Sequence, residues 1–157
     1  MLTALLAVAG TLLGTAVAAQ LQDRSARRAE AVQRRERARA ETIDAVRHLA
    51  GALSDHRRAM YLRAEAALAG SPHELIERLR ADSHHTRSQV NQPHLALRLL
   101  VTDRTVRTAA DTMIVATYAM RSAGDSWEAL EAARVQAVEA HDAFVDSAAR
   151  HLQAADR

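Results

Sequence analysis

Hydrophobic and polar positions divide the chain into three stretches with different patterns. Residues 2–22 carry no charged side chain, and the first charged side chain along the sequence is Asp23. Residues 23–42 are polar on every side of a helix, so they offer no apolar stripe for packing. From Ile43 onward, apolar side chains recur at steps of three and four residues, which predicts helices that pack on one another. We therefore expect three parts, at residues 1–22, 23–42 and 43–157.

The uncharged segment is long enough to cross a lipid bilayer as a helix. Twenty-one residues at about 1.5 Å per residue span roughly 31 Å, close to the thickness of the hydrocarbon core. The segment predicts a transmembrane helix that continues without a break into residues 23–42. Two alternatives stay open: a secretory signal cleaved after Ala18, although no basic residue precedes the segment, or a helix buried in a core or an oligomer.

Three small residues within this segment recur four positions apart. They are Gly10, Gly14 and Ala18. Small side chains at this spacing let two transmembrane helices approach closely, so they predict a face for self-association. Because the segment is rich in Ala, Gly and Thr, such spacing also arises by chance. A homo-oligomer formed through this face is therefore a hypothesis.

Seven arginines follow the uncharged segment within sixteen residues. They are Arg24, Arg27, Arg28, Arg34, Arg35, Arg37 and Arg39. Basic residues beside a membrane span hold that end in the cytoplasm, which places the N-terminus outside the cell membrane. In that position the guanidinium groups meet the phosphates of anionic lipids. Nucleic acid is a less favoured partner, because four acidic residues interleave the arginines and the chain has only four aromatic side chains for stacking on bases.

Two glycine-containing turns separate the expected helices of the third part. Gly70 suits a left-handed helix end, and the following Ser71, Pro72 and Glu74 form a capping-box pattern for the next helix. A second turn at residues 124–128 offers Gly124 as a helix end and Asp125 with Glu128 as another capping box. Short connections make consecutive helices antiparallel.

Proline and a short apolar run mark the middle of the third part. Pro93 predicts a kink or break near residue 92, because it lacks a backbone N–H. The run from Leu95 to Val101 is apolar enough for a strand, but no partner strand is evident in the sequence. Thr102 or Asp103 can cap the next helix. The predicted fold is all-α: a transmembrane helix that continues into an antiparallel four-helix bundle in the cytoplasm.

Composition narrows the chemistry of the chain. It has no Cys, which excludes disulfides, thiol nucleophiles and thiolate metal sites. All 21 basic residues are Arg, and 36 residues are Ala. The net charge of +2 is unevenly spread, with +3 on residues 23–42 (seven Arg, four acids) and −1 on residues 43–157 (fourteen Arg, fifteen acids). The composition of the whole chain is close to that of a soluble protein only because it averages over an uncharged segment, a basic segment and a nearly neutral bundle.

Candidate metal and catalytic residues do not form a recognisable set. Asp82, His84 and His85 lie close together, but a di-iron bundle needs a second carboxylate-His pair at the same spacing on another helix. We find no nucleophile with a base, no phosphate loop and no paired carboxylates. We expect no cofactor, no metal and no enzymatic activity.

Several short strings in the first 65 residues resemble a known group of proteins. They are Ala-Gly-Thr-Leu-Leu-Gly at residues 9–14, Arg-Arg-Glu-Arg at residues 34–37, and Ala-Leu-Ser-Asp-His-Arg-Arg-Ala at residues 52–59. In layout the chain resembles small membrane-anchored proteins of filamentous bacteria, a group that includes the Kil-type spread proteins of conjugative plasmids. The resemblance implies a membrane-associated accessory that helps plasmid DNA to spread between cell compartments, and it transfers no functional residues.

Taken together, these features predict a non-enzymatic, single-pass membrane protein that acts as a helical scaffold. The expected partners are membrane lipid, a second copy of the chain and a protein of the membrane transfer machinery. The alternative is a soluble or exported helical bundle that binds a partner or ligand, with its N-terminal segment cleaved or buried in an oligomer.

Overall fold

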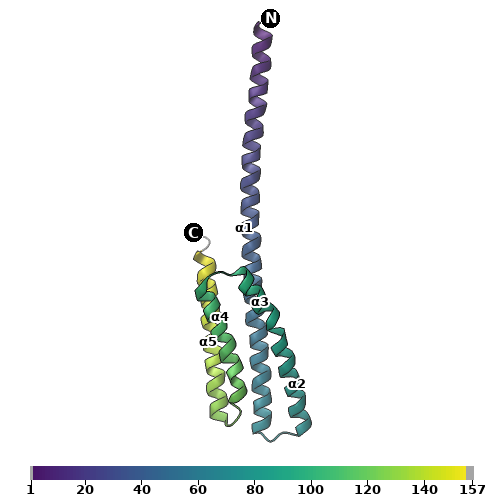
Figure 1. Ribbon diagram of the computed structural model, residues 1–157, viewed down its shortest axis with the longest axis vertical. Coiled ribbons are helices and arrows are strands. Elements are labelled where there is room, and N and C mark those ends of the chain that lie inside the picture. The colour runs from purple at the N-terminus through teal and green to yellow at the C-terminus, as the bar shows by residue number, and fades with distance from the viewer. Residues whose placement is uncertain (1, 155–157) are drawn as a thin grey trace. The chain divides into compact units, whose positions relative to one another are not determined.

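The computed structural model describes the backbone of residues 2–154, and the side chains of residue 22 and residues 24–154 (Figure 1). Throughout this range the ordered elements are helices, which confirms the all-α prediction. They are α1 (Leu2–Leu68), α2 (His73–Gln89), α3 (Asn91–Leu100), α4 (Arg104–Ala119), the short 3-10 helix η1 (Met120–Ser122) and α5 (Trp127–Ala154). The chain divides into two compact units, Met1–Ala40 and Glu41–Arg157.

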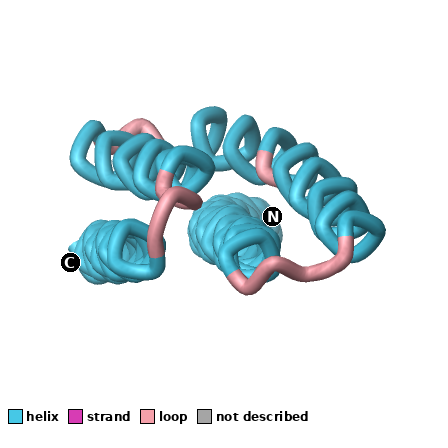
Figure 2. The backbone as a smooth tube through the Cα atoms, turned by 90° about the horizontal axis from the view of Figure 1, so that it is seen from below, coloured by secondary structure: helices cyan, strands magenta, loops and turns pink. Residues whose placement is uncertain are grey.

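The second unit is a bundle of four helical arms. Its arms are the C-terminal part of α1, then α2 with α3, then α4 with η1, and finally α5, and successive arms run in opposite directions (Figures 1 and 2). The predicted antiparallel bundle is therefore confirmed, with one arm made of two helices. That arm breaks at Val90, three residues before Pro93, so the proline occupies the first turn of α3, where no helical N–H bond is needed.

Two apolar clusters form the core of the bundle. The larger cluster joins α1, α3, α4 and α5, and its fully buried members include Leu49, Leu53, Leu97, Met113 and Phe144. The smaller cluster consists of Met60, Met120, Leu130 and Ala137, with partly buried neighbours around it. Alanine fills several buried positions in both clusters, and small side chains there let the helices approach closely.

The buried stripe of α1 differs slightly from the predicted one. Leu53 and Met60 lie on the three-four apolar pattern that begins at Ile43, and both are buried, but Ile43 itself is 43% exposed. The buried positions of α1 also include Ala45, Leu49 and His56, each one residue before Val46, Ala50 and Arg57 of that pattern. The buried stripe is therefore rotated slightly around the helix relative to the pattern, and it includes one polar residue, His56.

The turns follow the predicted positions but not always the predicted caps. Gly70 adopts φ 66°, the left-handed conformation expected for it. The N-cap of α2 is Pro72 and not Ser71, and no side chain caps this helix. Asp103 caps α4 as predicted, accepting hydrogen bonds from the backbone N–H groups of Thr105 (2.8 Å) and Val106 (3.1 Å). At α5 the capping hydroxyl belongs to Ser126, and not to the predicted Asp125.

The predicted transmembrane segment lies outside the residues whose side chains are described, as do Gly10, Gly14 and Ala18. Among the described residues, no helix combines the length and the apolar character that crossing a membrane requires. The apolar run from Leu95 to Leu100 is helical, and Val101 is the extended residue that follows it.

Candidate functional site: an arginine stripe and a basic cavity

The seven predicted arginines lie on the described part of α1 and are all exposed. At about 100° per residue, Arg24, Arg28, Arg35 and Arg39 fall within about 60° of one another around the helix. We call these four residues the arginine stripe. Of the other three, Arg27 and Arg34 flank the stripe on one side, whereas Arg37 projects from a different side of the helix.

Acidic residues avoid the arginine stripe. Glu30 lies about 150° from the centre of the stripe and Glu36 lies about 90° from it. The backbone carbonyl of Glu30 accepts a hydrogen bond at 3.3 Å from Nε of Arg34, one of the two arginines that flank the stripe. A helix with basic groups on one side and acids elsewhere presents a row of charges to a flat or linear polyanion. The Glu30 and Glu36 side chains noted in the sequence therefore start from other sides of the helix than the centre of the stripe.

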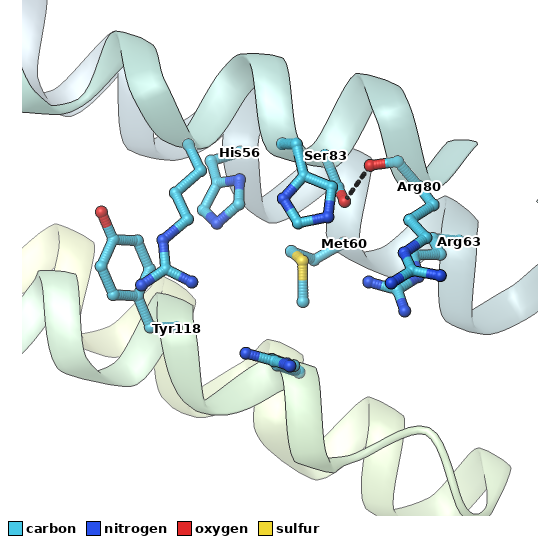
Figure 3. Close-up of a pocket in the computed structure, with 9 residues that line it drawn as sticks. His56, Met60, Arg63, Arg80, Ser83 and Tyr118 are labelled. Carbon is cyan, nitrogen blue, oxygen red and sulfur yellow. Dashed lines mark hydrogen bonds between the residues drawn. The ribbon is translucent and has the colours of Figure 1, made fainter. Parts of the chain in front are cut away.

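A second basic site, not predicted from the sequence, is a cavity inside the bundle. It has a volume of about 60 Å³ and lies where the C-terminal part of α1, α2, α4 and η1 converge (Figure 3). We call it the basic cavity. Its lining residues are His56, Met60, Arg63, Arg80, Ser83, His84, Arg87, Tyr118 and Arg121.

Aromatic contacts fix one end of the basic cavity. The guanidinium carbon of Arg87 lies 4.5 Å from the centre of the Tyr118 ring, a cation–π contact. His56 meets the same ring edge-on, with the ring centres 5.4 Å apart. Arg63 and Arg80 lie together at the opposite end of the cavity (Figure 3). The cationic groups thus approach the cavity from several sides.

The lining of the basic cavity contains four arginines and two histidines but no carboxylate. Arg80 reaches a carboxylate outside the cavity, with Nη1 3.6 Å from Oε1 of Glu77. Within the described part of the chain, no ion pair is formed by Arg63, Arg87 or Arg121. The lining of the basic cavity therefore carries a local excess of positive charge.

His56 is the buried polar residue of the basic cavity, with an exposed fraction of 2%. Its Nδ1 lies 3.0 Å from the Thr86 hydroxyl. The same hydroxyl lies within donating distance of the backbone carbonyls of Asp82 (3.1 Å) and Ser83 (3.2 Å), and when its proton goes to one of them, Nδ1 of His56 is the donor to the hydroxyl oxygen. Burial, followed by the nearby charges of Arg87 and His84, lowers the pKa of His56 below its usual 6.5. The imidazole is therefore held neutral near pH 7.

This lowered pKa predicts that acid weakens the bundle through His56. Below about pH 6.5 the unfolded chain takes up a proton at this residue before the folded chain does, so the free energy of unfolding falls with decreasing pH. Above that pH both states are neutral at His56 and the effect is absent. His56→Asn, which keeps a donor near Thr86 but cannot titrate, should reduce the loss of stability between pH 7 and pH 5.5, measured by urea denaturation.

The matched control is His85→Asn on the exposed side of α2. This variant should keep the pH dependence of the parent protein, because His85 does not face the buried cavity. Equal pH dependence in the parent, His56→Asn and His85→Asn proteins would show that His56 does not carry the effect.

A polar chain joins α1 to α5 elsewhere in the bundle. Ser54 Oγ lies 3.4 Å from Nε2 of His141, and Nδ1 of His141 lies 3.2 Å from Oδ1 of Asp142. The order Ser-His-Asp is that of a hydrolase triad, which the sequence analysis missed because Ser54 and His141 are 87 positions apart. The serine contact is long, and Nη2 of Arg57 also donates to the same hydroxyl at 3.5 Å. We interpret these side-chain contacts as a structural link between α1 and α5.

The histidines that were considered as metal ligands do not cluster. His84 and His85 are both exposed on α2. Among the described residues, no group of three or more His, Asp or Glu side chains is arranged to hold a metal ion. His141 and His151 are partly buried and contact Asp142 and Asp103 respectively.

One signal in the sequence pointed to the basic cavity. Arg80, His84 and Arg87 are spaced four and three residues apart, so they share one face of α2. The partners Arg63 and Arg121 come from other arms of the bundle, and their approach depends on the tertiary fold. The sequence thus indicated a basic helix face without revealing that it lines a cavity.

Fold and sites define an all-α bundle protein with an N-terminal arginine-rich helix and a basic interior cavity. A family model described as KilB plasmid transfer protein matches residues 43–152. Protein KilB of Streptomyces lividans is 40% identical over 154 residues, which cover 98% of this chain and 100% of that protein. The chain belongs to the KilB plasmid transfer protein family. No solved structure is significantly similar to it.

Membership of this family confirms the resemblance to Kil-type plasmid proteins that the sequence indicated. The matched residues 43–152 fall within the bundle, whereas the resemblance rested on short strings in the first 65 residues. The similarity to the Streptomyces lividans protein extends over both units of the chain.

Proposed function

We propose that this chain is a non-enzymatic accessory protein of plasmid transfer, anchored in the cell membrane by residues 2–22. Its N-terminus lies outside, and its bundle lies in the cytoplasm. The observation that carries the proposal is the one-sided arginine stripe, which begins two residues after the uncharged segment ends. The name of the Streptomyces lividans relative and the family description support the link to plasmid transfer.

Charge and hydropathy support the membrane part of the proposal. The uncharged segment has the length of a bilayer core, and a positive-inside arrangement follows when all nearby arginines lie on its C-terminal side. The arginine stripe then contacts anionic headgroups at the inner surface of the membrane. Contact with nucleic acid is the less favoured use of the same arginines, because aromatic residues are absent from residues 23–42.

Self-association is part of the same proposal. Gly10, Gly14 and Ala18 provide a small-residue face on which two copies of the segment pack closely. The bundle would then be presented as an oligomer to a protein of the membrane transfer machinery. The non-enzymatic role is supported by a sequence without Cys or a phosphate-loop motif.

Membrane extraction of the full-length chain tests the anchor. The protein should stay in the membrane pellet after high salt and alkaline carbonate. Leu12→Arg places a charge near the middle of the segment, at a cost of about 2.5–3.5 kcal/mol for insertion, and should move the protein into the soluble fraction. Gln22→Arg places the same charge at the end of the segment and serves as the matched control, because a charge there reaches the headgroups.

Two results would contradict the anchor. The first is release of the parent protein from the membrane by carbonate. The second is a mature chain beginning near Ala19, which would favour a cleaved signal and an exported bundle.

Self-association is tested in the same membranes. Gly10→Leu combined with Gly14→Leu should lower the yield of cross-linked dimer, and an unchanged yield would show that these residues do not form the oligomer face.

A further inference from the structure

We propose that the basic cavity binds a small phosphate-bearing anion, either a diphosphate or a phosphate monoester, between Arg63 of α1, Arg80 and Arg87 of α2, and Arg121 of η1. This site is separate from the arginine stripe, and it does not depend on whether the chain is anchored in a membrane. All of its lining residues lie within the bundle unit.

The charge of the lining is the first argument. Four arginine residues line a volume of about 60 Å³, and no carboxylate is among the lining residues. The core contacts of the bundle come from the two apolar clusters beside the cavity. An anion that enters the cavity converts mutual repulsion among the arginines into attraction to a shared partner.

The kind of donor is the second argument. Arginine presents a planar fork of N–H groups that matches two oxygens of a phosphate at once. Forks that approach from three different segments suit a tetrahedral group with oxygens in several directions better than a planar carboxylate. A cavity of about 60 Å³ holds more than the minimum for a single water molecule and has room for one phosphoryl group.

The positioning of the donors is the third argument. Arg87 is held against the Tyr118 ring at 4.5 Å, so less side-chain freedom is lost when it binds a ligand. Arg63 is partly buried, whereas Arg80, Arg87 and Arg121 are exposed and mark the open side of the cavity. The phosphoryl group therefore enters between the arginines, and the rest of the ligand faces solvent.

The buried imidazole of His56 fits an anion site as well. Its Nδ1 is hydrogen-bonded to the Thr86 hydroxyl. The groups that face this residue are Arg80, His84 and Arg87 from α2, Tyr118 from α4, Arg121 from η1, and Arg63 from its own helix. An anion among these cations favours the protonated imidazole, so binding should raise the pKa of His56.

The test is titration of the full-length chain, in zwitterionic detergent at constant ionic strength, with sodium pyrophosphate and separately with inorganic phosphate. Heat of binding should be detected, together with a rise in melting temperature that grows with ligand concentration. Arg80→Gln and Arg121→Gln should each weaken binding at least about tenfold, as expected for loss of one charge-assisted contact. Sodium chloride at matched ionic strength should give no response.

The control is Arg78→Gln on the same helix. Arg78 is exposed, does not line the cavity, and lies 3.5 Å from a carboxylate oxygen of Glu74. This variant should bind pyrophosphate within about twofold of the parent, since it changes the net charge equally but leaves the cavity intact. Equal weakening by Arg78→Gln and Arg80→Gln, or the absence of any response in the parent protein, would overturn the proposal.

Two further measurements distinguish a free phosphate ligand from a lipid phosphate. The chain is reconstituted in nanodiscs of phosphatidylcholine alone and in nanodiscs that also contain phosphatidic acid. If the cavity binds a soluble phosphate, pyrophosphate should bind equally well in the two kinds of nanodisc. If a lipid headgroup fills the cavity, pyrophosphate should bind in phosphatidylcholine nanodiscs, and phosphatidic acid should block this binding. In the second case, Arg121→Gln should remove the difference between the two kinds of nanodisc.

Discussion

Replacing the four arginines of the stripe with glutamine is expected to weaken binding of residues 23–157 to anionic vesicles by about two to three orders of magnitude. The expectation follows from their common face on α1, where each basic residue near an anionic membrane contributes about 1 kcal/mol. Sedimentation of the fragment with vesicles of phosphatidylglycerol and phosphatidylcholine measures the effect. The interaction should also weaken as the salt concentration rises.

The control for this experiment removes the same amount of charge from the bundle. Arg58, Arg78, Arg98 and Arg104 are all exposed there. Their replacement by glutamine should reduce vesicle binding far less, because they do not form a single row. Circular dichroism checks that both variants keep their helical content. Equal losses in the two variants would show that net charge, and not the arginine stripe, determines membrane contact.

The largest loss of stability is expected at Phe144, which is fully buried in the larger core cluster. Phe144→Ala should lower the free energy of unfolding by about 3–5 kcal/mol, through lost burial and the cavity that remains. The same cluster contains Leu49 of α1 and Met113 of α4, so it joins three arms of the bundle. Urea denaturation followed by circular dichroism measures the change.

Val145 provides the matched control for Phe144. It is the next residue of α5, and its exposed fraction is 39%. Val145→Ala should change the free energy of unfolding by less than about 1 kcal/mol. If both variants were destabilised equally, the assignment of Phe144 to the shared core would be wrong.

Local signals in the sequence were sufficient to predict the helical arms. Gly70 and Asp103 have one dominant backbone role each, and both adopt it. The predicted caps Ser71 and Asp125 were wrong by one residue, because Pro72 and Ser126 compete for the same position at each helix start. The burial of His56 was not predictable, since its stability there depends on Thr86 and Tyr118 from other arms.

The two basic sites differ in how far the sequence reveals them. The arginine stripe is a matter of spacing within one helix, so the residues alone were enough to find it. The basic cavity combines residues from position 56 to position 121, and it exists only after four segments have packed. His84, considered from the sequence only as a metal ligand, is exposed on α2 and also lines the cavity.

Uneven burial along the arms has a consequence for the dynamics of the bundle. Ser83 is the single buried residue of α2, whereas α4 buries Val106, Ala110, Met113 and Thr117. Local opening of α2 therefore breaks few core contacts, and its amides should exchange with solvent at a lower free-energy cost than those of α4. Because α2 also carries Arg80 and Arg87, local opening of this helix should widen the exposed side of the basic cavity, and a bound anion should order the helix.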